Sequence, residues 1–343
     1  MQIDCIVVSR KSFRIATIVR PKAGSGQTCE QSGRINHEPS TICHPLFMMD
    51  KYISYRLAQI ISRTLPRQFA YWLGLRIADH FYASDHAGRR AVMSNFRQIL
   101  TMQGITASDK TLEQMARKNF QYFGKYLVDF FKFARFTPTG IQRLVSLEHI
   151  EYLEQAEALG RGIIFITAHL GNWELGGAIL TSTGRRIHAV YLPQRASKIN
   201  ELFQKYRSQR GLQCIPLGHA ARGVMGALKR KECVAMLADR DFTAHHFPIL
   251  FFGKPAYLSS GPARIAVKTQ APLVPTFILR QPDDTFLLRL YPPIVPNPRT
   301  TVAELQEHIR DVLEQEIGRN PLQWFMFDNF WNPRRNHESS LTP

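Results

Sequence analysis

The sequence predicts an α/β protein with a mixed or mostly parallel central sheet flanked by helices, preceded by a basic, amphipathic, helical N-terminal region. Two observations predict this fold class. Beyond residue 140, short apolar runs suited to buried strands alternate with segments of helical periodicity, whereas residues 49–140 show helical periodicity alone. The chain has 343 residues, 44% of them hydrophobic, and is long enough to bury a sizeable core.

Residues 1–48 differ from the rest of the chain. They contain a Gly/Ser/Gln stretch and no sustained periodicity, so we expect a disordered leader. Arg10, Lys11 and Arg14 interrupt the apolar run that a signal peptide would need. No stretch approaches the roughly 18–20 apolar residues of a spanning helix. We therefore expect a protein of the cytoplasm or of a membrane surface.

The next region, 49–140, is expected to hold helices that associate with a membrane. A helix over 50–65 has an apolar face with Arg56 and Arg63 along its edge, and an aromatic-rich helix follows Pro66. Apolar, basic and Trp/Tyr residues together are typical of an interfacial membrane helix, although two helices packed on the domain explain the pattern equally well. Two more helices are expected, over 89–103 and 109–133.

The α/β domain is expected over 141–332, followed by a polar tail, 333–343. Its apolar runs predict strands at 162–167, 187–191, 233–237, 273–278 and 286–290. Helical segments lie between or after them, at 173–182, 197–210, 219–230, 261–270 and 302–317. Alternation of this kind is what predicts the sheet with flanking helices.

The charge balance predicts an anionic partner. Lys and Arg exceed Asp and Glu by 44 − 27 = +17, which suits nucleic acid, a phospholipid surface or an acidic protein. The basic residues are dispersed and no nucleic-acid-binding motif is present, so nucleic acid is not the expected partner. Five scattered cysteines without a C-x-x-C pair, and the adjacent His245 and His246, give no metal-site pattern.

The segment T-A-H-L-G-N-W-E, 167–174, carries the strongest chemical signal. A buried strand ends, His169 follows, Asn172 is a favourable helix N-cap, and Glu174 falls in the first helical turn. A turn before the helix would bring the imidazole and the carboxylate together. A carboxylate on one ring nitrogen leaves the other free as a general base. A histidine that only caps the strand–helix turn is the alternative.

Further residues, in two segments, are candidates for substrate binding. Asp239 and Asp241 end a buried strand, where ligand sites of α/β sheets concentrate, although Asp239 paired with Arg240 is the structural alternative. Ser259, Ser260 and Gly261 are expected to open a helix whose free N–H groups, with the nearby Arg264, bind phosphate, or to form an ordinary helix cap.

The H-x4-E block at 169–174 resembles that of the late lipid A acyltransferases (lauroyl/myristoyl type), within the glycerolipid and lysophospholipid acyltransferase superfamily. The resemblance runs from about 49 to 332 and implies a glycerolipid acyltransferase-like fold. Further blocks resemble the family in order: V-Y-L-P (190–193), L-A-D-R-D (237–241), F-F-G-K-P-A (251–256), S-S-G-P-A-R (259–264), L-V-P (273–275) and P-L-Q-W-F (321–325).

The resemblance implies transfer of a fatty acyl chain from an acyl thioester to a hydroxyl of a membrane glycolipid such as a lipid A precursor. The donor would be acyl carrier protein, or coenzyme A, with no cofactor and no metal. His169 would be the general base and Glu174 would orient it. The enzyme would sit peripherally on the cytoplasmic face of the bacterial inner membrane. No G-x-S-x-G elbow is present to form an acyl-enzyme.

Two departures from the family pattern bear on the acceptor. Leu192 stands where arginine is usual, with Arg195 expected to substitute, and Asp328-Asn329 replaces a basic pair. These differences leave open another glycolipid, such as a phosphoinositide mannoside, or a lysophospholipid. A catalytically silent lipid-binding scaffold and a nucleic-acid-binding protein are the rivals of other classes. The intact His169/Glu174 pair argues against the silent scaffold.

Overall fold

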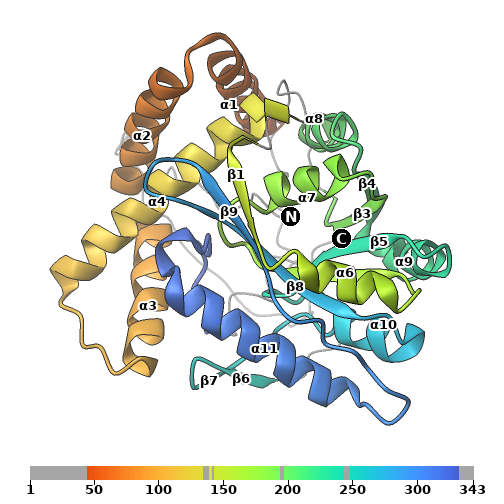
Figure 1. Ribbon diagram of the computed structural model, residues 1–343. Helices are drawn as coiled ribbons and strands as arrows, with labels where there is room; N and C mark the ends of the chain where they lie inside the picture. The colour runs from red at the N-terminus through yellow and green to blue at the C-terminus, as the bar shows by residue number, and fades with distance from the viewer. Residues whose placement is uncertain (1–44, 134–138, 141–142, 194–196, 243–247, 332–343) are drawn as a thin grey trace, which may run out of the picture.

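The computed structural model describes residues 45–133, 139–140, 143–193, 197–242 and 248–331, and shows a helical layer packed on an α/β unit (Figure 1). Four helices form the N-terminal layer: α1 (Pro45–Thr64), α2 (Arg67–Ser84), α3 (His86–Met102) and α4 (Asp109–Lys132). Helix α1 thus extends into the segment expected to be a leader. In the described residues, no helix is long and apolar enough to cross a membrane.

The α/β unit is built on a seven-stranded sheet with the order β1-β9-β8-β2-β5-β3-β4. β8 and β9 are antiparallel and the other neighbouring strands are parallel, which confirms the predicted fold class. The strands are β1 (Val145–Glu148), β2 (Ile163–Thr167), β3 (Ile187–Tyr191), β4 (Gln213–Pro216), β5 (Cys233–Leu237), β8 (Leu273–Arg280) and β9 (Phe286–Leu290).

Helices cover both faces of the sheet, because alternate residues of each buried strand point to opposite sides. In β2, Ile163 and Phe165 join a core with α6 (Glu151–Ala158) and α7 (Trp173–Ser182). Ile164 and Ile166 join the opposite core, to which three helices of the α/β unit contribute beside α8 (Ser197–Ser208) and the N-terminal layer. These helices are α9 (Ala220–Lys229), α10 (Gly261–Thr269) and α11 (Val302–Arg319).

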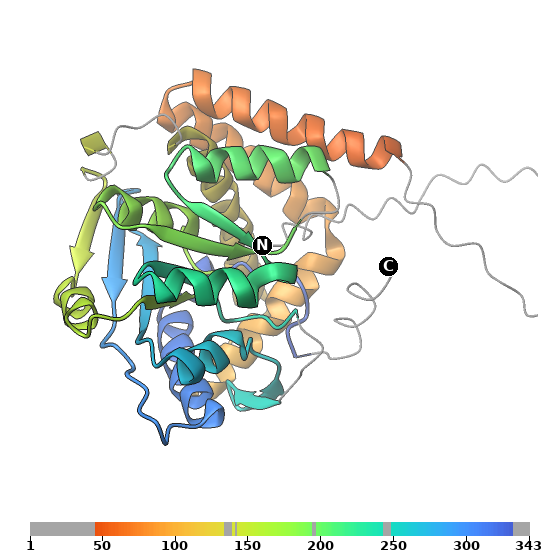
Figure 2. The ribbon, with the colours of Figure 1, turned by 90° about the vertical axis from the view of Figure 1, so that its right-hand side faces the viewer.

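The helical layer and the α/β unit share that second core. α8 lies beside α1 and packs Phe203 and Tyr206 against the aromatic side chains of α4 (Figure 2). At the end of β8, Arg280 pairs with Asp129 of α4 and donates to the Tyr71 hydroxyl of α2 at 3.0 Å. The two layers are therefore joined by both apolar and ionic contacts.

The five strands predicted from the sequence are confirmed, and four short ones were not predicted. These are β1, β4 and the hairpin of β6 (Ile249–Phe251) and β7 (Lys254–Ala256). Short 3-10 turns complete the fold, η2 (Leu217–His219) and η3 (Pro321–Gln323). The chain after η3 returns to the carboxyl end of β2, which places the aromatic tail beside the predicted site.

Candidate active site

The site lies at the carboxyl ends of β2 and β5, which are parallel neighbours. Their register pairs Thr167 with Leu237, the last residue of each strand. His169 and Asp239 each follow two residues later, so the sheet brings them together although they are far apart in sequence. Carboxyl ends of parallel strands are where α/β proteins concentrate their ligand sites.

The Asp239 carboxylate holds His169 at two points. Its Oδ1 lies 2.9 Å from the imidazole Nδ1, and its Oδ2 accepts the His169 backbone N–H at 3.0 Å. Oδ2 also accepts the indole N–H of Trp324 at 3.0 Å. Burial acts to raise the pKa of Asp239, but the His169 charge and these hydrogen bonds outweigh it and lower the pKa below its usual value.

With Nδ1–H donating to Asp239, a neutral His169 carries its lone pair on Nε2. Nε2 is buried and has no hydrogen-bond partner among the described residues. The Trp173 ring stands edge-on to the imidazole, with centroids 5.3 Å apart. The arrangement therefore has the geometry of a general base: an oriented imidazole with one nitrogen held by a carboxylate and the other left for a substrate proton.

A glycine makes the turn after His169 possible. Gly171 has a φ of +64°, and a Cβ there would lie 1.9 Å from the Ile278 carbonyl oxygen of β8. Asn172 then caps α7, because its Oδ1 accepts the Leu175 N–H at 3.2 Å. The Asn172 Nδ2 is buried without a hydrogen-bond partner among the residues described.

Glu174 does not hold His169 in this structure, contrary to the contact expected from the sequence. Its carboxylate accepts hydrogen bonds from Arg207 of α8, at 2.7 Å from Nη2 and 3.2 Å from Nε. The first turn of α7 directs Glu174 toward α8, while Asp239 occupies the Nδ1 side of the imidazole. A catalytic role for Glu174 stays a prediction.

The predicted phosphate-binding residues meet at the start of α10. Ser260 is the N-cap without a side-chain cap bond, and Arg264 Nε donates to its hydroxyl at 3.2 Å. The Ser259 N–H donates to the Ala238 carbonyl, which ties this helix to the end of β5 beside Asp239. Gly261 is the first helical residue.

The remaining predicted residues lie around or outside this centre. Arg240 pairs with Asp328 at 2.9 Å, not with Asp239 as the structural alternative proposed. Asp241 follows on the same loop and is half-buried. Arg195 and the His245-His246 pair lie outside the described residues. Within the described ranges, no group of His, Cys, Asp or Glu residues is arranged to hold a metal ion.

Two hollows lie near the His169–Asp239 pair, and neither His169 nor Asp239 lines them. The first, between the sheet and α7, has mostly apolar walls and measures about 700 Å³ including its open mouth; Trp173, Gly177, Leu180 and Ala189 line it. The second measures about 450 Å³ on the same basis and is lined by Tyr191, Leu192, Leu237, Arg240, Phe242 and Ser259. Trp173, which touches the imidazole ring, places the first hollow beside His169.

Two residues that hold side chains of this site in place, Arg207 and Trp324, are not predicted from the sequence. Arg207 carries no motif signal, since it is one cation among many on a basic chain. Trp324 lies in the P-L-Q-W-F block, but the block itself does not indicate a bond to Asp239.

Comparisons with known proteins match most of the chain. A family model described as bacterial lipid A biosynthesis acyltransferase matches residues 44–332. A phosphatidylinositol mannoside acyltransferase of Mycobacterium tuberculosis is 23% identical, over 73% of this chain and 79% of that protein. A lipid A biosynthesis palmitoleoyltransferase of Escherichia coli is 24% identical, over 81% of this chain and 89% of that protein.

Among solved structures, a 1-acyl-sn-glycerophosphate (LPA) acyltransferase from Thermotoga maritima aligns with a TM-score of 0.35 and 16% sequence identity. The alignment covers 74% of this chain and 98% of that one.

Proposed function

This chain belongs to the bacterial lipid A biosynthesis acyltransferase family and is an acyltransferase, and we propose that it moves a fatty acyl chain from an acyl thioester to a hydroxyl of a membrane glycolipid. The observation that carries the proposal is the buried His169–Asp239 pair at the carboxyl edge of the sheet. Such a pair supplies the base that an alcohol nucleophile needs.

In the proposed reaction, the oxygen of the acceptor hydroxyl attacks the carbonyl carbon of the thioester. His169 Nε2 takes the proton of that hydroxyl in the same step. Asp239 stabilises the imidazolium that results. The tetrahedral intermediate collapses, the carbon–sulfur bond breaks, and the leaving thiolate takes the proton from the imidazolium. An ester and a free thiol remain, and no acyl-enzyme forms.

The hollow between the sheet and α7 suits the acyl chain. Its walls are mostly apolar, and it begins beside the catalytic imidazole at Trp173. Asn172 Nδ2, a buried amide without a partner in the described chain, is the donor we assign to the substrate. The second hollow is also mostly apolar, but Arg240 and Ser259 line it, and we assign it to the acceptor headgroup on the strength of these two polar side chains.

The acceptor class that fits best is a glycolipid. One named relative is a lipid A biosynthesis palmitoleoyltransferase and the other a phosphatidylinositol mannoside acyltransferase, and the identities of 24% and 23% do not separate them. We propose that the group acylated here is likewise a hydroxyl of a glycolipid. The lipid A precursor is our first candidate and the phosphoinositide mannoside the second.

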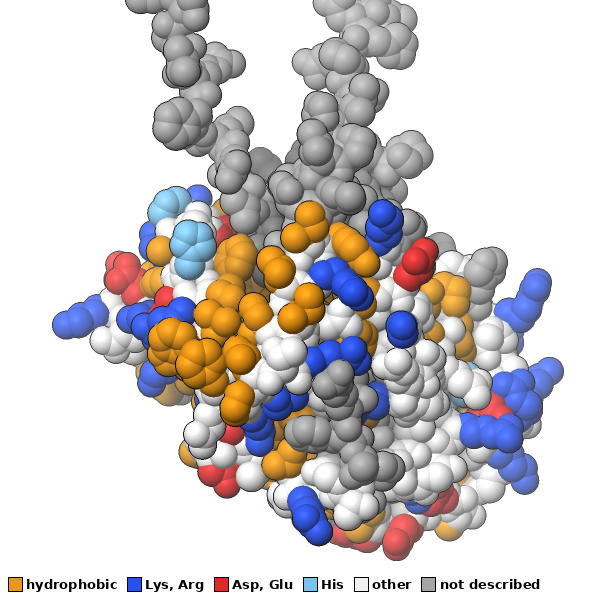
Figure 3. Space-filling view, turned by 90° about the horizontal axis from the view of Figure 1, so that it is seen from above, with side chains coloured by type: hydrophobic (Ala, Val, Ile, Leu, Met, Phe, Trp, Pro, Cys, Tyr) orange, Lys and Arg blue, Asp and Glu red, His pale blue; other side chains and the backbone are white. Residues whose placement is uncertain are grey.

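A membrane surface is the proposed working place, on the cytoplasmic side of the inner membrane. Figure 3, which looks down on the side where α1 and α2 lie, shows hydrophobic side chains gathered with Lys and Arg among them. Exposed hydrophobic residues of these two helices are Ile53, Leu57, Ile60, Phe69, Trp72 and Ile77. Helices of this composition lie in the bilayer interface, and the net charge of +17 would attract anionic lipid and an acidic acyl carrier protein.

The test is acyl transfer by the purified full-length protein, measured by mass spectrometry of the lipid product. Acyl carrier protein and coenzyme A thioesters are offered separately to a lipid A precursor and to a phosphatidylinositol mannoside. The wild type should add one acyl chain to one acceptor, and His169→Ala should lower the rate by about 10²–10⁴-fold. His308→Ala, which removes an exposed histidine of α11, is the matched control and should retain the wild-type rate. A folded His169→Ala protein with near-normal turnover would contradict the mechanism.

A further inference from the structure

We propose that Trp324 is a positioning residue of the active site, whose indole N–H fixes the Asp239 carboxylate and, through it, the catalytic imidazole. The inference rests on the proposed acyl transfer by His169. It assigns a role to the P-L-Q-W-F block, which the reaction itself does not use.

The first support is that the two oxygens of the Asp239 carboxylate have different partners. Oδ1 faces the imidazole Nδ1, while Oδ2 is held by two donors, the His169 backbone N–H and the Trp324 indole N–H, each at 3.0 Å. Asp239 is fully buried, so water does not replace a lost donor. Two donors on one oxygen fix the plane of the carboxylate, and that plane sets the direction of the bond to the ring.

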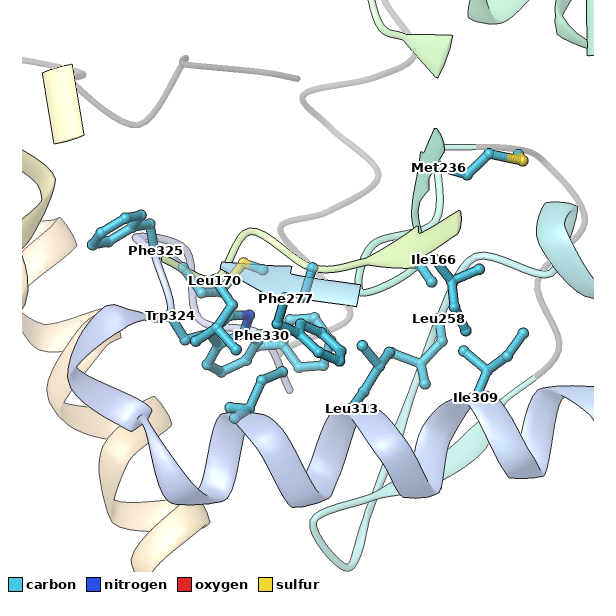
Figure 4. Close-up of a cluster of buried hydrophobic side chains, with 14 of the residues drawn as sticks. Ile166, Leu170, Met236, Leu258, Phe277, Ile309, Leu313, Trp324, Phe325 and Phe330 are labelled. Carbon is cyan, nitrogen blue, oxygen red and sulfur yellow. The ribbon is translucent and has the colours of Figure 1, made fainter. Parts of the chain in front are cut away.

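The second support is that the indole is itself held in place. Trp324 is 1% exposed and packs against Leu170, Phe277 and Phe330 (Figure 4). Its carbonyl accepts a hydrogen bond from Asn119 Nδ2 at 2.9 Å. A donor fixed by packing on all sides orients a carboxylate better than a mobile one.

The third support is that the tail is joined to the catalytic turn on both sides of Trp324. The Gly171 N–H donates to the Gln323 carbonyl at 2.9 Å, and the Phe325 N–H donates to the His169 carbonyl at 2.8 Å. The Gln323 side chain exchanges two hydrogen bonds with the Arg280 backbone, at 2.9 and 3.0 Å. The indole and the histidine therefore belong to one hydrogen-bonded unit.

His169 and Trp324 are the main groups that lower the pKa of Asp239. Burial acts to raise this pKa, and the charge and hydrogen bonds of His169 together with the indole N–H of Trp324 lower it. Arg240, the adjacent cation, pairs with Asp328 and lies over the Phe242 ring. Loss of the indole donor would therefore remove one of the main contributions that stabilise the Asp239 carboxylate.

The experiment compares Trp324→Phe with Trp331→Phe. Trp331 lies in the same aromatic cluster, and its indole N–H donates to the Phe251 carbonyl at 2.9 Å, so the control removes the same group from a neighbouring site. Trp324→Phe should lower kcat by about 10–100-fold, the range expected for a hydrogen bond to a charged group. The acceptor KM should stay near the wild-type value.

The pH profile separates positioning from a general loss of structure. Without the indole bond, the Asp239 carboxylate is less stabilised and its pKa rises. A more basic carboxylate holds the imidazole N–H more strongly and so favours the protonated state of the His169–Asp239 pair. The acid limb of kcat/KM should therefore move to higher pH in Trp324→Phe and stay in place in Trp331→Phe. Replacing Trp324 by benzothienylalanine, which keeps the ring shape without the N–H, should reproduce both effects if phenylalanine disturbs folding.

Equal kcat and equal pH profiles for the Trp324 and Trp331 variants would overturn the inference. If His169→Ala is inactive in the same assay, equal behaviour of the two tryptophan variants leaves the proposed function intact and rules out only the role of Trp324. If His169→Ala is active, the proposed function fails and the role of Trp324 fails with it.

Discussion

At the residue scale, the pair to which we assign catalysis comes from the sheet and not from neighbours in the sequence. His169 and Asp239 are both predicted as site residues, but the orienting contact is predicted for Glu174, from the turn before the helix and the resemblance of the H-x4-E block. The bond to Asp239 depends on β2 and β5 being adjacent and in register, which apolar periodicity does not reveal. The Trp324 bond depends on the path of the tail after η3, which is equally hidden from the sequence.

Glu174 is expected to act through Arg207, by fixing α8 against α7. Both side chains are about nine-tenths buried, and loss of one partner leaves an uncompensated charge. Glu174→Gln should therefore lower the free energy of unfolding by about 3–5 kcal/mol. Urea denaturation of the purified variant measures this cost.

A double variant separates this structural role from a catalytic one. Glu174→Gln with Arg207→Met removes both charges and should regain stability relative to the single variant, together with most of the acyl-transfer rate. A double variant that is stable but inactive would show that Glu174 or Arg207, both of which line the hollow between the sheet and α7, acts on the reaction directly. Glu157→Gln, which breaks the more exposed pair with Arg185, should change stability by no more than about 1 kcal/mol.

At the element scale, hydrophobic periodicity predicts the long helices and the buried strands. It does not predict the short strands, which bury few side chains. β2 and β8 are almost wholly buried and read as apolar runs, while α4 and α11 show clear helical spacing. The missed strands have three or four residues each. β1 and β4 lie at the two edges of the sheet, where pairing with a neighbour and not burial makes the strand.

Helix α2 carries the sharpest test of membrane docking. Phe69 and Trp72 stack on each other, with centroids 5.4 Å apart, and are each about half exposed. Phe69→Ser with Trp72→Ser should weaken sedimentation with anionic vesicles about tenfold or more, because two aromatic side chains lose apolar burial in the interface.

The matched control for this test is Leu250→Ser on β6, a similarly exposed side chain at the other end of the molecule (Figure 1). It should leave vesicle binding and unfolding temperature unchanged. Equal binding by the control and by the α2 variant would place the membrane contact elsewhere.

At the scale of the whole molecule, the helical layer and the catalytic sheet are connected through Arg280. This residue ends β8, pairs with Asp129 of α4, and shares backbone hydrogen bonds with Gln323 in the tail that reaches His169. Asp284 also pairs with Arg280, at 3.1 Å, but is more exposed. The helical layer and the candidate site are therefore joined by direct contacts through Arg280, and we expect them to unfold together.

Asp129→Asn tests this connection. The substitution keeps the side-chain shape but leaves the buried Arg280 guanidinium with only the more exposed Asp284 as an ionic partner. It should lower the free energy of unfolding by about 3 kcal/mol, the lower end of the cost of breaking a buried pair. Because α2 and α4 are joined to the sheet here, far-UV circular dichroism and tryptophan fluorescence should shift together in one transition. Two separate transitions already in the wild type, with Asp129→Asn lowering only the one that belongs to the helical layer, would show instead that this layer folds independently and that Arg280 does not couple it to the sheet.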